Sequence, residues 1–336
     1  MGGHARVNVV TSRALLAADC GSGVGLGHLE RMLALADALR PDLEVAVVVP
    51  EGDESLRRRV AERGHASLAK PGDASQRVEA AVAADASVHV VVLDGYVFDV
   101  SLQRRLRTRA QLTVVDDLCL PADCDLGVNP SPGGEQMRPT AVGTFLGGAS
   151  FALLRASFLE ARELVSSRGR PPRTVLVATG ATDPGGIGAT VTAELLTADA
   201  TVDVIRVVGP DTDARVNLKQ PRERRLVAPL TLADVLSGVT VYVGAAGTTA
   251  VQAACVGVPA VITAVVPNQV AQAAALAAGG CAVAADAQGL ARMCLQLLDD
   301  PARCEAMAAH GRALVDGRGA ARVAQAVRDL AASRAA

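Results

Sequence analysis

The sequence predicts an α/β protein with two Rossmann-like domains, whose parallel sheets face one another across a cleft. The first indication is length, because 336 residues exceed one ordinary domain core and suit two. The second is a regular alternation of strand-length apolar runs with longer helical patterns. The third is that runs such as 45–49 and 88–93 are almost continuously apolar, as strands buried on both faces are.

In the first half, strands are expected at 15–18, 44–49, 88–93 and 112–115, each followed by a helical segment. A polar stretch with a proline pair, 166–173, is expected to be the linker. Beyond it, strands are expected at 174–178, 202–208, 239–243 and 260–263, with helices beginning near Gly185, Thr231, Thr248 and Asn268. We therefore expect domains at 1–165 and 174–336, with the helical tail at 288–332 packing back on the first domain.

The composition favours a small-molecule ligand. The 33 basic and 35 acidic residues are spread along the chain and give a net charge of −2, so the positive surface that nucleic-acid binding needs is not expected. The apolar stretches at 256–266 and 271–285 are too short or too interrupted for a membrane span. The apolar run at 14–18 ends at Asp19 and is too short for a signal peptide, so a cytoplasmic location is expected.

The cysteines predict neither a disulfide framework nor a zinc site. The chain has seven of them, an odd and scattered set without a CxxC pair or a histidine partner at ligand spacing. We expect reduced thiols, no metal and no other cofactor. Nothing in the sequence specifies the oligomeric state.

A glycine-rich loop separates the first expected strand from the first helix. In it Gly25 and Gly27 precede His28, and Arg31 lies one helical turn later. Glycines let the backbone approach a ligand, and a helix N-terminus attracts negative charge. The glycine spacing is neither a dinucleotide fingerprint nor a P-loop. The loop is either a tight turn capped by His28 or, as we favour, a ligand loop in which His28 is the general base.

A second glycine turn, in the other half, is expected to bind phosphate. Gly247, Thr248 and Thr249 follow an expected strand and open a helix, so the two hydroxyls and the helix dipole favour a diphosphate. Gln252 lies one turn along and is expected to reach a ribose hydroxyl. In the alternative interpretation, Thr248 is an ordinary N-cap and Gln252 is its capping-box partner.

Two weaker patterns accompany this turn in the same half. Gly180 and Asp183 form another glycine turn after strand 174–178, at the matching edge of the sheet. Asn268 and Gln269 begin a helix, where their amides either cap the helix or bind sugar hydroxyls. All four residues are assigned to substrate binding.

Acidic residues follow two expected strands of the first half. Asp94 and Tyr96 come after strand 88–93, and Asp116 and Asp117 follow strand 112–115. Strand ends are where α/β sheets bind ligands, although acidic residues there are also common in solvated turns. We assign Asp94 and Tyr96, together with His28, to the catalytic group.

Taken together, these segments resemble the PseG family, UDP-sugar hydrolases of the pseudaminic acid pathway that have the glycosyltransferase-B architecture and are similar to the MurG glycosyltransferases. The family pattern of Asp, glycine turn, Gly-x-Gly-His and Arg appears as Asp19, 25–28 and Arg31. Further segments match the family pattern in the same order along the chain. They are Tyr96, 114–118, the signature Leu-Gly, Leu-Leu-Arg and Phe at 145–158, and then 247–249, 257–259 and 268–269. The resemblance implies that His28 is the catalytic base.

Four positions depart from the family pattern. Ala17 replaces an arginine, Gly95 an aspartate, Ala181 a glycine and Gln252 a glutamate. Glutamine still accepts a hydrogen bond but carries no charge, so the usual substrate of the family does not carry over directly.

The expected function is therefore nucleotide-sugar hydrolysis, with His28 activating water for attack on the anomeric carbon and the second half binding the nucleoside diphosphate. The alternative is a glycosyltransferase, in which a small acceptor takes the place of water. A third interpretation, a binding subunit without catalysis, is disfavoured by the presence of His28. Fold and motifs alone do not separate these activities.

Overall fold

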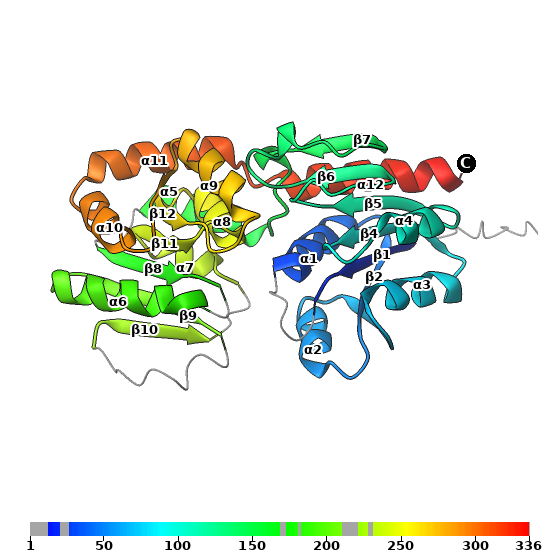
Figure 1. Ribbon diagram of the computed structural model, residues 1–336, viewed down its shortest axis with the longest axis horizontal. Helices are drawn as coiled ribbons and strands as arrows, with labels where there is room; N and C mark the ends of the chain where they lie inside the picture. The colour runs from blue at the N-terminus through cyan, green and yellow to red at the C-terminus, as the bar shows by residue number, and fades with distance from the viewer. Residues whose placement is uncertain are drawn as a thin grey trace, which may run out of the picture. The chain divides into compact units, whose positions relative to one another are not determined.

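The computed structural model describes residues 13–20, 27–168, 173–180, 183–209, 221–227 and 231–335. They divide into two compact units. Unit 1 comprises the described parts of Met1–Val128, Pro139–Phe145 and Ala321–Ala336, and unit 2 comprises those of Asn129–Arg138 and Leu146–Ala320. Each unit is built on one sheet with helices on both of its faces (Figure 1).

The sheet of unit 1 has the Rossmann strand order. Its strands are β1 (Arg13–Ala18), β2 (Glu44–Pro50), β3 (Ala66–Lys70), β4 (Val88–Asp94), β5 (Gln111–Val115), β6 (Cys124–Asn129) and β7 (Val142–Gly147). They are arranged as β3-β2-β1-β4-β5-β6-β7, and the neighbours from β3 to β6 run parallel. The order reverses between β1 and β4, which is where ligands bind in such sheets.

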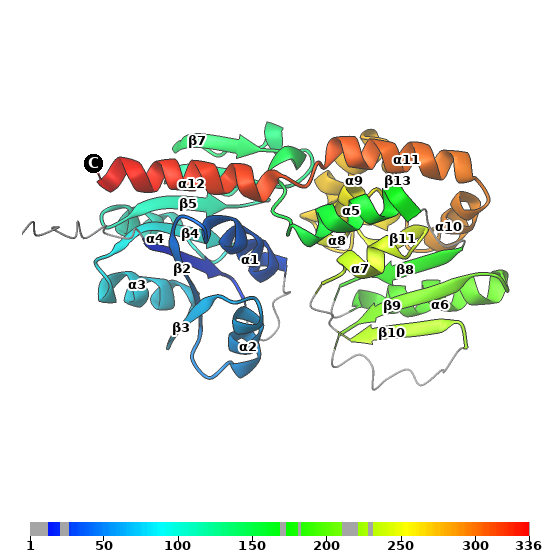
Figure 2. The same ribbon diagram turned by 180° about the vertical axis from the view of Figure 1, so that it is seen from behind.

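Two layers of helices cover this sheet. The helices are α1 (Gly27–Leu39), α2 (Glu54–Glu62), α3 (Ala74–Ala84), α4 (Val100–Arg107) and α12 (Gly319–Ala335). Apolar residues of α3 and α4 form one core with alternate residues of β1, β4 and β5. On the other face α12 lies beside α1 in both views, and Arg328 donates to the Ala38 carbonyl (3.1 Å) and pairs with Asp42 (Figure 2).

Unit 2 repeats the same topology. Its strands are β8 (Thr174–Ala178), β9 (Asp203–Val208), β10 (Glu223–Val227), β11 (Val241–Ala245), β12 (Ala260–Thr263) and β13 (Ala282–Ala284). Their order, β10-β9-β8-β11-β12-β13, is parallel throughout and reverses between β8 and β11. The second switch point therefore lies at the carboxyl ends of β8 and β11.

The helices of unit 2 also form two layers. They are α5 (Ser157–Arg168), α6 (Ile187–Ala198), α7 (Ala233–Ser237), α8 (Thr248–Val256), α9 (Gln269–Ala278), α10 (Leu290–Leu298) and α11 (Pro301–Leu314), with 3-10 turns η1 (Gly134–Gln136), η2 (Ala149–Phe151) and η3 (Pro184–Gly186). Helices α5, α7, α8 and α9 share one core, whereas α6, α10 and α11 share the other. Alternate residues of β8 and β11 face the two cores, which explains their unbroken apolar sequences.

The predicted fold class is confirmed: both units are α/β with parallel sheets. All eight strands expected from the sequence are present, and within the described ranges five others were missed, namely β3, β6, β7, β10 and β13. Strand β10 illustrates the reason, because it is an edge strand with the sequence ERRLV in which no residue is buried. Edge strands need no apolar run and often carry charge.

The expected linker at 166–173 does not separate the two units, because all of it falls within the span of unit 2. Residues 166–168 continue α5, since no proline interrupts the helix before 171, and Ser166 Oγ donates to the Arg162 carbonyl (3.0 Å). The remaining linker residues 169–172 lie outside the described residues. Helix α5 contacts α7 and α8, so residues 146–168 belong to unit 2 rather than to a domain ending at 165. In the C-terminal tail, α10 and α11 belong to unit 2, and Ala321–Ala336 belongs to unit 1.

Among the helices that the structure describes, none combines the length and apolarity that a membrane span requires. All seven cysteines are free thiols, six of them buried and Cys119 half-buried.

Candidate active site

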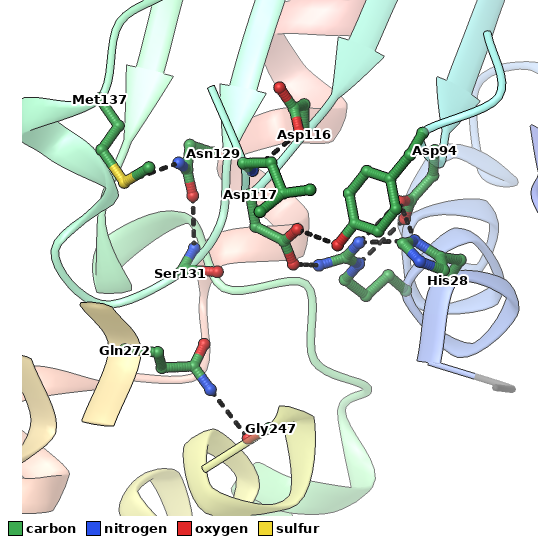
Figure 3. A network of polar contacts seen from close by, with 12 residues as sticks. His28, Asp94, Asp116, Asp117, Asn129, Ser131, Met137, Gly247 and Gln272 are labelled. Carbon is green, nitrogen blue, oxygen red and sulfur yellow. Dashed lines mark hydrogen bonds and ion pairs between the residues drawn. The ribbon is translucent and has the colours of Figure 1, made fainter. Parts of the chain in front are cut away.

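The histidine of the glycine loop meets an aspartate at the switch point of unit 1. His28 is the second residue of α1, which follows β1, and Asp94 is the last residue of the neighbouring strand β4. The two strands are in register there, with Ala18 paired to Asp94. His28 Nδ1 lies 2.7 Å from Asp94 Oδ1 (Figure 3). Residues 66 positions apart are thus brought together by the strand order.

Arg31 connects this pair to a second carboxylate. It lies one helical turn after His28, on the same face of α1. Its Nε and Nη2 donate to the two oxygens of Asp94 (3.0 and 2.7 Å), and its Nη1 donates to Asp117 Oδ2 (2.7 Å). Tyr96 Oη donates to the other oxygen of Asp117 (2.5 Å). Five side chains therefore form one continuous network.

Burial strengthens the interactions within this network. Asp94 is fully buried and Arg31 is 8% exposed. Burial by itself would lower the pKa of the Arg31 guanidinium, but Asp94 and Asp117 raise it above its usual value. Burial would raise the pKa of Asp117, but the Arg31 charge and the hydrogen bonds from Tyr96 and Arg31 bring it below its usual value. One guanidinium and two carboxylates leave a net charge of about −1 beside His28.

Both polar contacts that the His28 ring makes with described residues are made by Nδ1. Nδ1 lies 2.7 Å from Asp94 Oδ1 and 2.8 Å from Arg31 Nη2. The Asp94 carboxylate only accepts, so its contact is a hydrogen bond when Nδ1 carries the proton, whereas Arg31 Nη2 has two N–H groups and donates one of them to Asp94. In the tautomer with the proton on Nδ1, Nε2 is the unprotonated nitrogen. Tyr96 contacts the imidazole edge to face, with ring centroids 5.1 Å apart and planes at 88°.

Gly95 occupies a position where a side chain does not fit. Its φ is +142°, and a Cβ built on it would lie 2.3 Å from the Cβ of Asp19. The backbone N–H of Asp19 donates to the Asp94 carbonyl (2.8 Å), so β1 and β4 are held close here. A side chain at position 95 would therefore clash with Asp19.

Gly95→Ala is therefore expected to lower the free energy of unfolding by roughly 2–4 kcal/mol, because it adds a clash to an unfavourable backbone conformation. Gly52→Ala is the matched control, since Gly52 also has a positive φ (+83°) but a Cβ built on it meets no atom within 4 Å. The control should cost only about 1 kcal/mol. Urea denaturation measures both values, and equal losses would contradict the close contact with Asp19.

The glycine turn of unit 2 begins helix α8 with two threonines, Thr248 and Thr249. Gly247 is the N-cap of α8 and has no side-chain capping bond. The alternative in which Thr248 is the N-cap of a capping box is therefore wrong. Among the described residues, neither Thr248 nor Thr249 has a hydrogen bond to its hydroxyl, and Gln252 Oε1 is buried without a partner. These groups lie at the carboxyl end of β11, beside the second switch point.

Gln272 of α9 holds this turn in place, whereas Gln269 bonds to the loop before its own helix. Gln272 Nε2 donates to the carbonyls of Ala246 (2.6 Å) and Gly247 (3.0 Å), and the second contact is drawn in Figure 3. Gln269 Oε1 accepts from the Val265 N–H (3.0 Å). Asn268 is the N-cap of α9 but does not cap it through its side chain. Sequence reasoning missed Gln272, although its position three residues after Gln269 places both on one helical face.

In the turn after β8, Gly180 is exposed to solvent, whereas the Asp183 side chain is hydrogen-bonded within the protein. Gly180 is exposed, has a φ of +98°, and has no atom within 4 Å of a Cβ built on it. Asp183 instead accepts hydrogen bonds from Gly188 N (2.8 Å), Ala189 N (3.3 Å) and Thr179 Oγ1 (2.6 Å). Its carboxylate therefore stabilises the start of α6. Gly25 lies outside the described residues, and Gly27 is the first residue of α1.

Asp116 also has a local role. It accepts from the backbone N–H groups of Leu118 (2.8 Å) and Leu120 (2.5 Å), and burial raises its pKa. The two adjacent aspartates thus have different roles, since Asp117 belongs to the His28 network and Asp116 stabilises the turn that follows β5. Among the described residues, no group of three His, Cys, Asp or Glu side chains is placed to hold a metal ion.

Comparisons with known proteins identify the architecture. No family model and no curated protein matches the sequence. Solved structures do match. SnogD, a glycosyltransferase from Streptomyces nogalater, has a TM-score of 0.67 and 20% identity over 96% of this chain and 100% of that one. The spinosyn forosaminyltransferase SpnP has a TM-score of 0.67 and 17% identity over 96% and 99%. MurG from Acinetobacter baumannii has a TM-score of 0.64 and 15% identity over 95% and 99%.

These matches show that the chain has the glycosyltransferase-B fold. That architecture is what the resemblance to the PseG family implied, so this part of the prediction is confirmed. Membership of the PseG family in particular stays a prediction.

Proposed function

We propose that this protein is a glycosyltransferase that moves a sugar from a nucleotide-sugar donor to a small acceptor. The observation that carries the proposal is the His28–Asp94 pair at the switch point of unit 1, with its 2.7 Å contact. The expectation from sequence was hydrolysis, with transfer as the alternative. The similar folds include several named glycosyltransferases, and this favours transfer over hydrolysis.

In the proposed mechanism, Asp94 holds the proton of His28 on Nδ1, and Nε2 removes the proton from the acceptor's hydroxyl or amine. The acceptor attacks the anomeric carbon, and the bond from that carbon to the diphosphate oxygen breaks. The nucleoside diphosphate leaves with the electron pair. The net negative charge of Arg31, Asp94 and Asp117 stabilises the imidazolium that forms. Tyr96 limits the rotation of the ring through its edge-to-face contact.

We assign unit 2 to the donor. The hydroxyls of Thr248 and Thr249, with the free N–H groups at the start of α8, bind the diphosphate. Gln252 Oε1, buried and without a partner among the described residues, accepts from a ribose hydroxyl. Gly180 and Gly247 allow close approach of the ligand, and Asn268 and Gln269 are assigned to the sugar hydroxyls. Gly25, Gly27 and Arg31 belong to the catalytic side, and a cytoplasmic location is part of the proposal.

Gln252→Ala is expected to weaken nucleoside diphosphate binding about five- to tenfold, because one hydrogen bond to a ribose hydroxyl is lost. Gln252→Glu should keep most of the affinity, since a carboxylate also accepts from a hydroxyl. Isothermal titration with UDP, GDP, ADP and dTDP measures these dissociation constants. Gln325→Ala, at an exposed glutamine of α12, is the control and should change nothing. Unchanged affinity in Gln252→Ala would remove Gln252 from the donor site.

The proposed function is tested with a panel of UDP-, GDP-, ADP- and dTDP-sugars, each incubated with and without an acceptor mixture. Transfer predicts that release of the nucleoside diphosphate depends on acceptor and is matched by a sugar conjugate. Release without acceptor, with free sugar as product, would instead establish the hydrolase. Binding without any release would indicate the noncatalytic subunit and overturn the proposal.

A further inference from the structure

Tyr242 is a fully buried side chain that the proposed mechanism does not use. Its hydroxyl donates to the carbonyls of Ala178 (2.9 Å) and Ala245 (2.8 Å), which are the last residues of β8 and β11. These two strands flank the switch point of unit 2. Burial raises the pKa of Tyr242, so the hydroxyl keeps its proton and remains a donor at neutral pH. One side chain therefore holds the ends of both strands beside the glycine turn.

The position of this hydroxyl depends on Gly244. A Cβ built at this position would lie 1.9 Å from the carbonyl oxygen of Ala178 and 2.8 Å from Tyr242 Oη. Any larger residue would therefore push β8 and β11 apart and displace the hydroxyl from its two acceptors. The absence of a side chain at position 244 makes the contact between Tyr242 and the strand ends possible.

Gln272 holds the next two carbonyls of the same turn. It belongs to α9, is 8% exposed, and donates through Nε2 to the carbonyls of Ala246 (2.6 Å) and Gly247 (3.0 Å) (Figure 3). An amide nitrogen has two N–H groups, one for each carbonyl. Together with the bond from Tyr242 to Ala245, three consecutive carbonyls accept from buried side chains. The carbonyls of 245–247 are thus directed toward the interior of unit 2.

The directions of these carbonyls also fix the N–H groups of the turn. In a trans peptide the C=O and the N–H point in opposite directions. Gln272 fixes the carbonyl of Ala246, so the Gly247 N–H points away from Gln272. Its second bond, to the Gly247 carbonyl, turns the Thr248 N–H away in the same manner. Neither N–H has a backbone acceptor within the part of the chain that the structure describes. Both are available to a ligand.

The restraint from Gln272 matters because Gly247 lies between the two peptides that it holds. Glycine has no Cβ to resist rotation of its neighbouring peptides. Rotation of either peptide would replace an N–H with a carbonyl oxygen, whose partial negative charge repels an anion. Donors that are already oriented bind an anion more tightly than donors that must first reorient. An anion site at this turn therefore depends on side chains behind it.

We propose that Gln272 and Tyr242 are positioning residues of the donor site, which fix the turn between β11 and α8 so that it presents N–H groups rather than carbonyls to the diphosphate. This inference rests on the proposed binding of a nucleotide-sugar donor by unit 2. Both residues act through the backbone of the turn, whereas the ribose contact assigned to Gln252 does not depend on them. Their removal should therefore weaken binding of the diphosphate and not of the nucleoside.

Gln272→Met retains the length of the side chain and removes its amide. It should raise the dissociation constant of the nucleoside diphosphate about tenfold and leave that of the nucleoside within about twofold, since only the orientation of the N–H groups is lost. Tyr242→Phe removes one hydroxyl and should have the same selective effect, about threefold. Isothermal titration of the full chain with UDP, GDP, ADP and dTDP, and with the matching nucleosides, measures these constants. Tyr242→Phe decides the result if Gln272→Met does not fold.

Gln103→Met is the matched control. Gln103 is also a buried glutamine bonded to backbone groups, since its Nε2 donates to the Phe98 carbonyl (2.8 Å) and its Oε1 accepts from the Asp123 N–H (2.7 Å). It belongs to unit 1. The control should lose stability in urea as Gln272→Met does, without a change in either dissociation constant. All titrations are run at a temperature at which melting curves show that the variants are folded.

The outcomes separate this inference from the proposed function. An unchanged diphosphate affinity in both Gln272→Met and Tyr242→Phe overturns the positioning role and leaves the proposed sugar transfer intact. Equal weakening of diphosphate and nucleoside also overturns it, because a general structural loss affects both ligands. A selective loss of diphosphate affinity, without turnover of any donor sugar by wild type, supports the positioning role and counts against transfer. A wild-type chain that binds no diphosphate overturns both this inference and the assignment of unit 2 to the donor.

Discussion

His28→Gln is expected to lower kcat for sugar transfer by about 10²–10⁴-fold, while the dissociation constant of the nucleoside diphosphate changes little. Glutamine fills similar space, but its amide does not take up a proton near neutral pH. The loss therefore reports the proton transfer at Nε2 rather than the packing of α1. The diphosphate affinity should persist because the residues assigned to it belong to unit 2.

His65→Gln is the matched control for this experiment. His65 is also a buried histidine paired with an aspartate, since its Nε2 lies 2.7 Å from Asp37 Oδ1, but it stands at the start of β3, outside the network. It should lower stability without a comparable fall in kcat. The measurement is the full dependence of rate on donor and acceptor for both variants. A kcat within a few-fold of wild type in His28→Gln would mean that another group is the base.

Much of the fold could be predicted from sequence because buried parallel strands have a distinctive local pattern. The valine-rich segments of β2 and β4 are apolar on both faces, and this pattern can be recognised without knowing any contact. Edge strands such as β10 carry no such pattern, since one side of the ladder is open and charged residues are tolerated. The boundary between the units could not be predicted either, because it depends on which helices α5 contacts rather than on its own sequence.

The candidate site shows the same division between local and nonlocal information. His28 was identifiable because the glycines, the histidine and the helix start are consecutive. The separate roles of Asp116 and Asp117 were not, because adjacent residues differ only in the direction of their side chains, and the strand end decides that direction. Asp183 shows a different limit of sequence reasoning. Its carboxylate accepts hydrogen bonds from Thr179 and from the backbone N–H groups of Gly188 and Ala189, and these nearby donors could not be recognised in the glycine pattern.

Asp94→Asn is expected to affect both stability and catalysis. Breaking a buried ion pair by neutralising one partner costs about 3–5 kcal/mol, because Arg31 then remains buried with less compensation. The free energy of unfolding, measured by urea denaturation, should fall by this amount. Asp37→Asn, at the partner of His65, is the control, and its smaller loss should come without the catalytic defect described next, since Asp37 is 35% exposed.

The catalytic loss in Asp94→Asn should reach about 10²–10⁴-fold in kcat among molecules that remain folded, for two physical reasons. First, one guanidinium and one carboxylate leave no net negative charge to stabilise the imidazolium. Second, Arg31 Nη2, 2.8 Å from His28 Nδ1, becomes the donor to that nitrogen. The ring proton then moves to Nε2, the nitrogen that must accept the acceptor's proton. The assays are run at a temperature at which melting curves show that the variant is folded, so that a lower kcat cannot result from unfolding. A normal kcat there would assign Asp94 to stability alone.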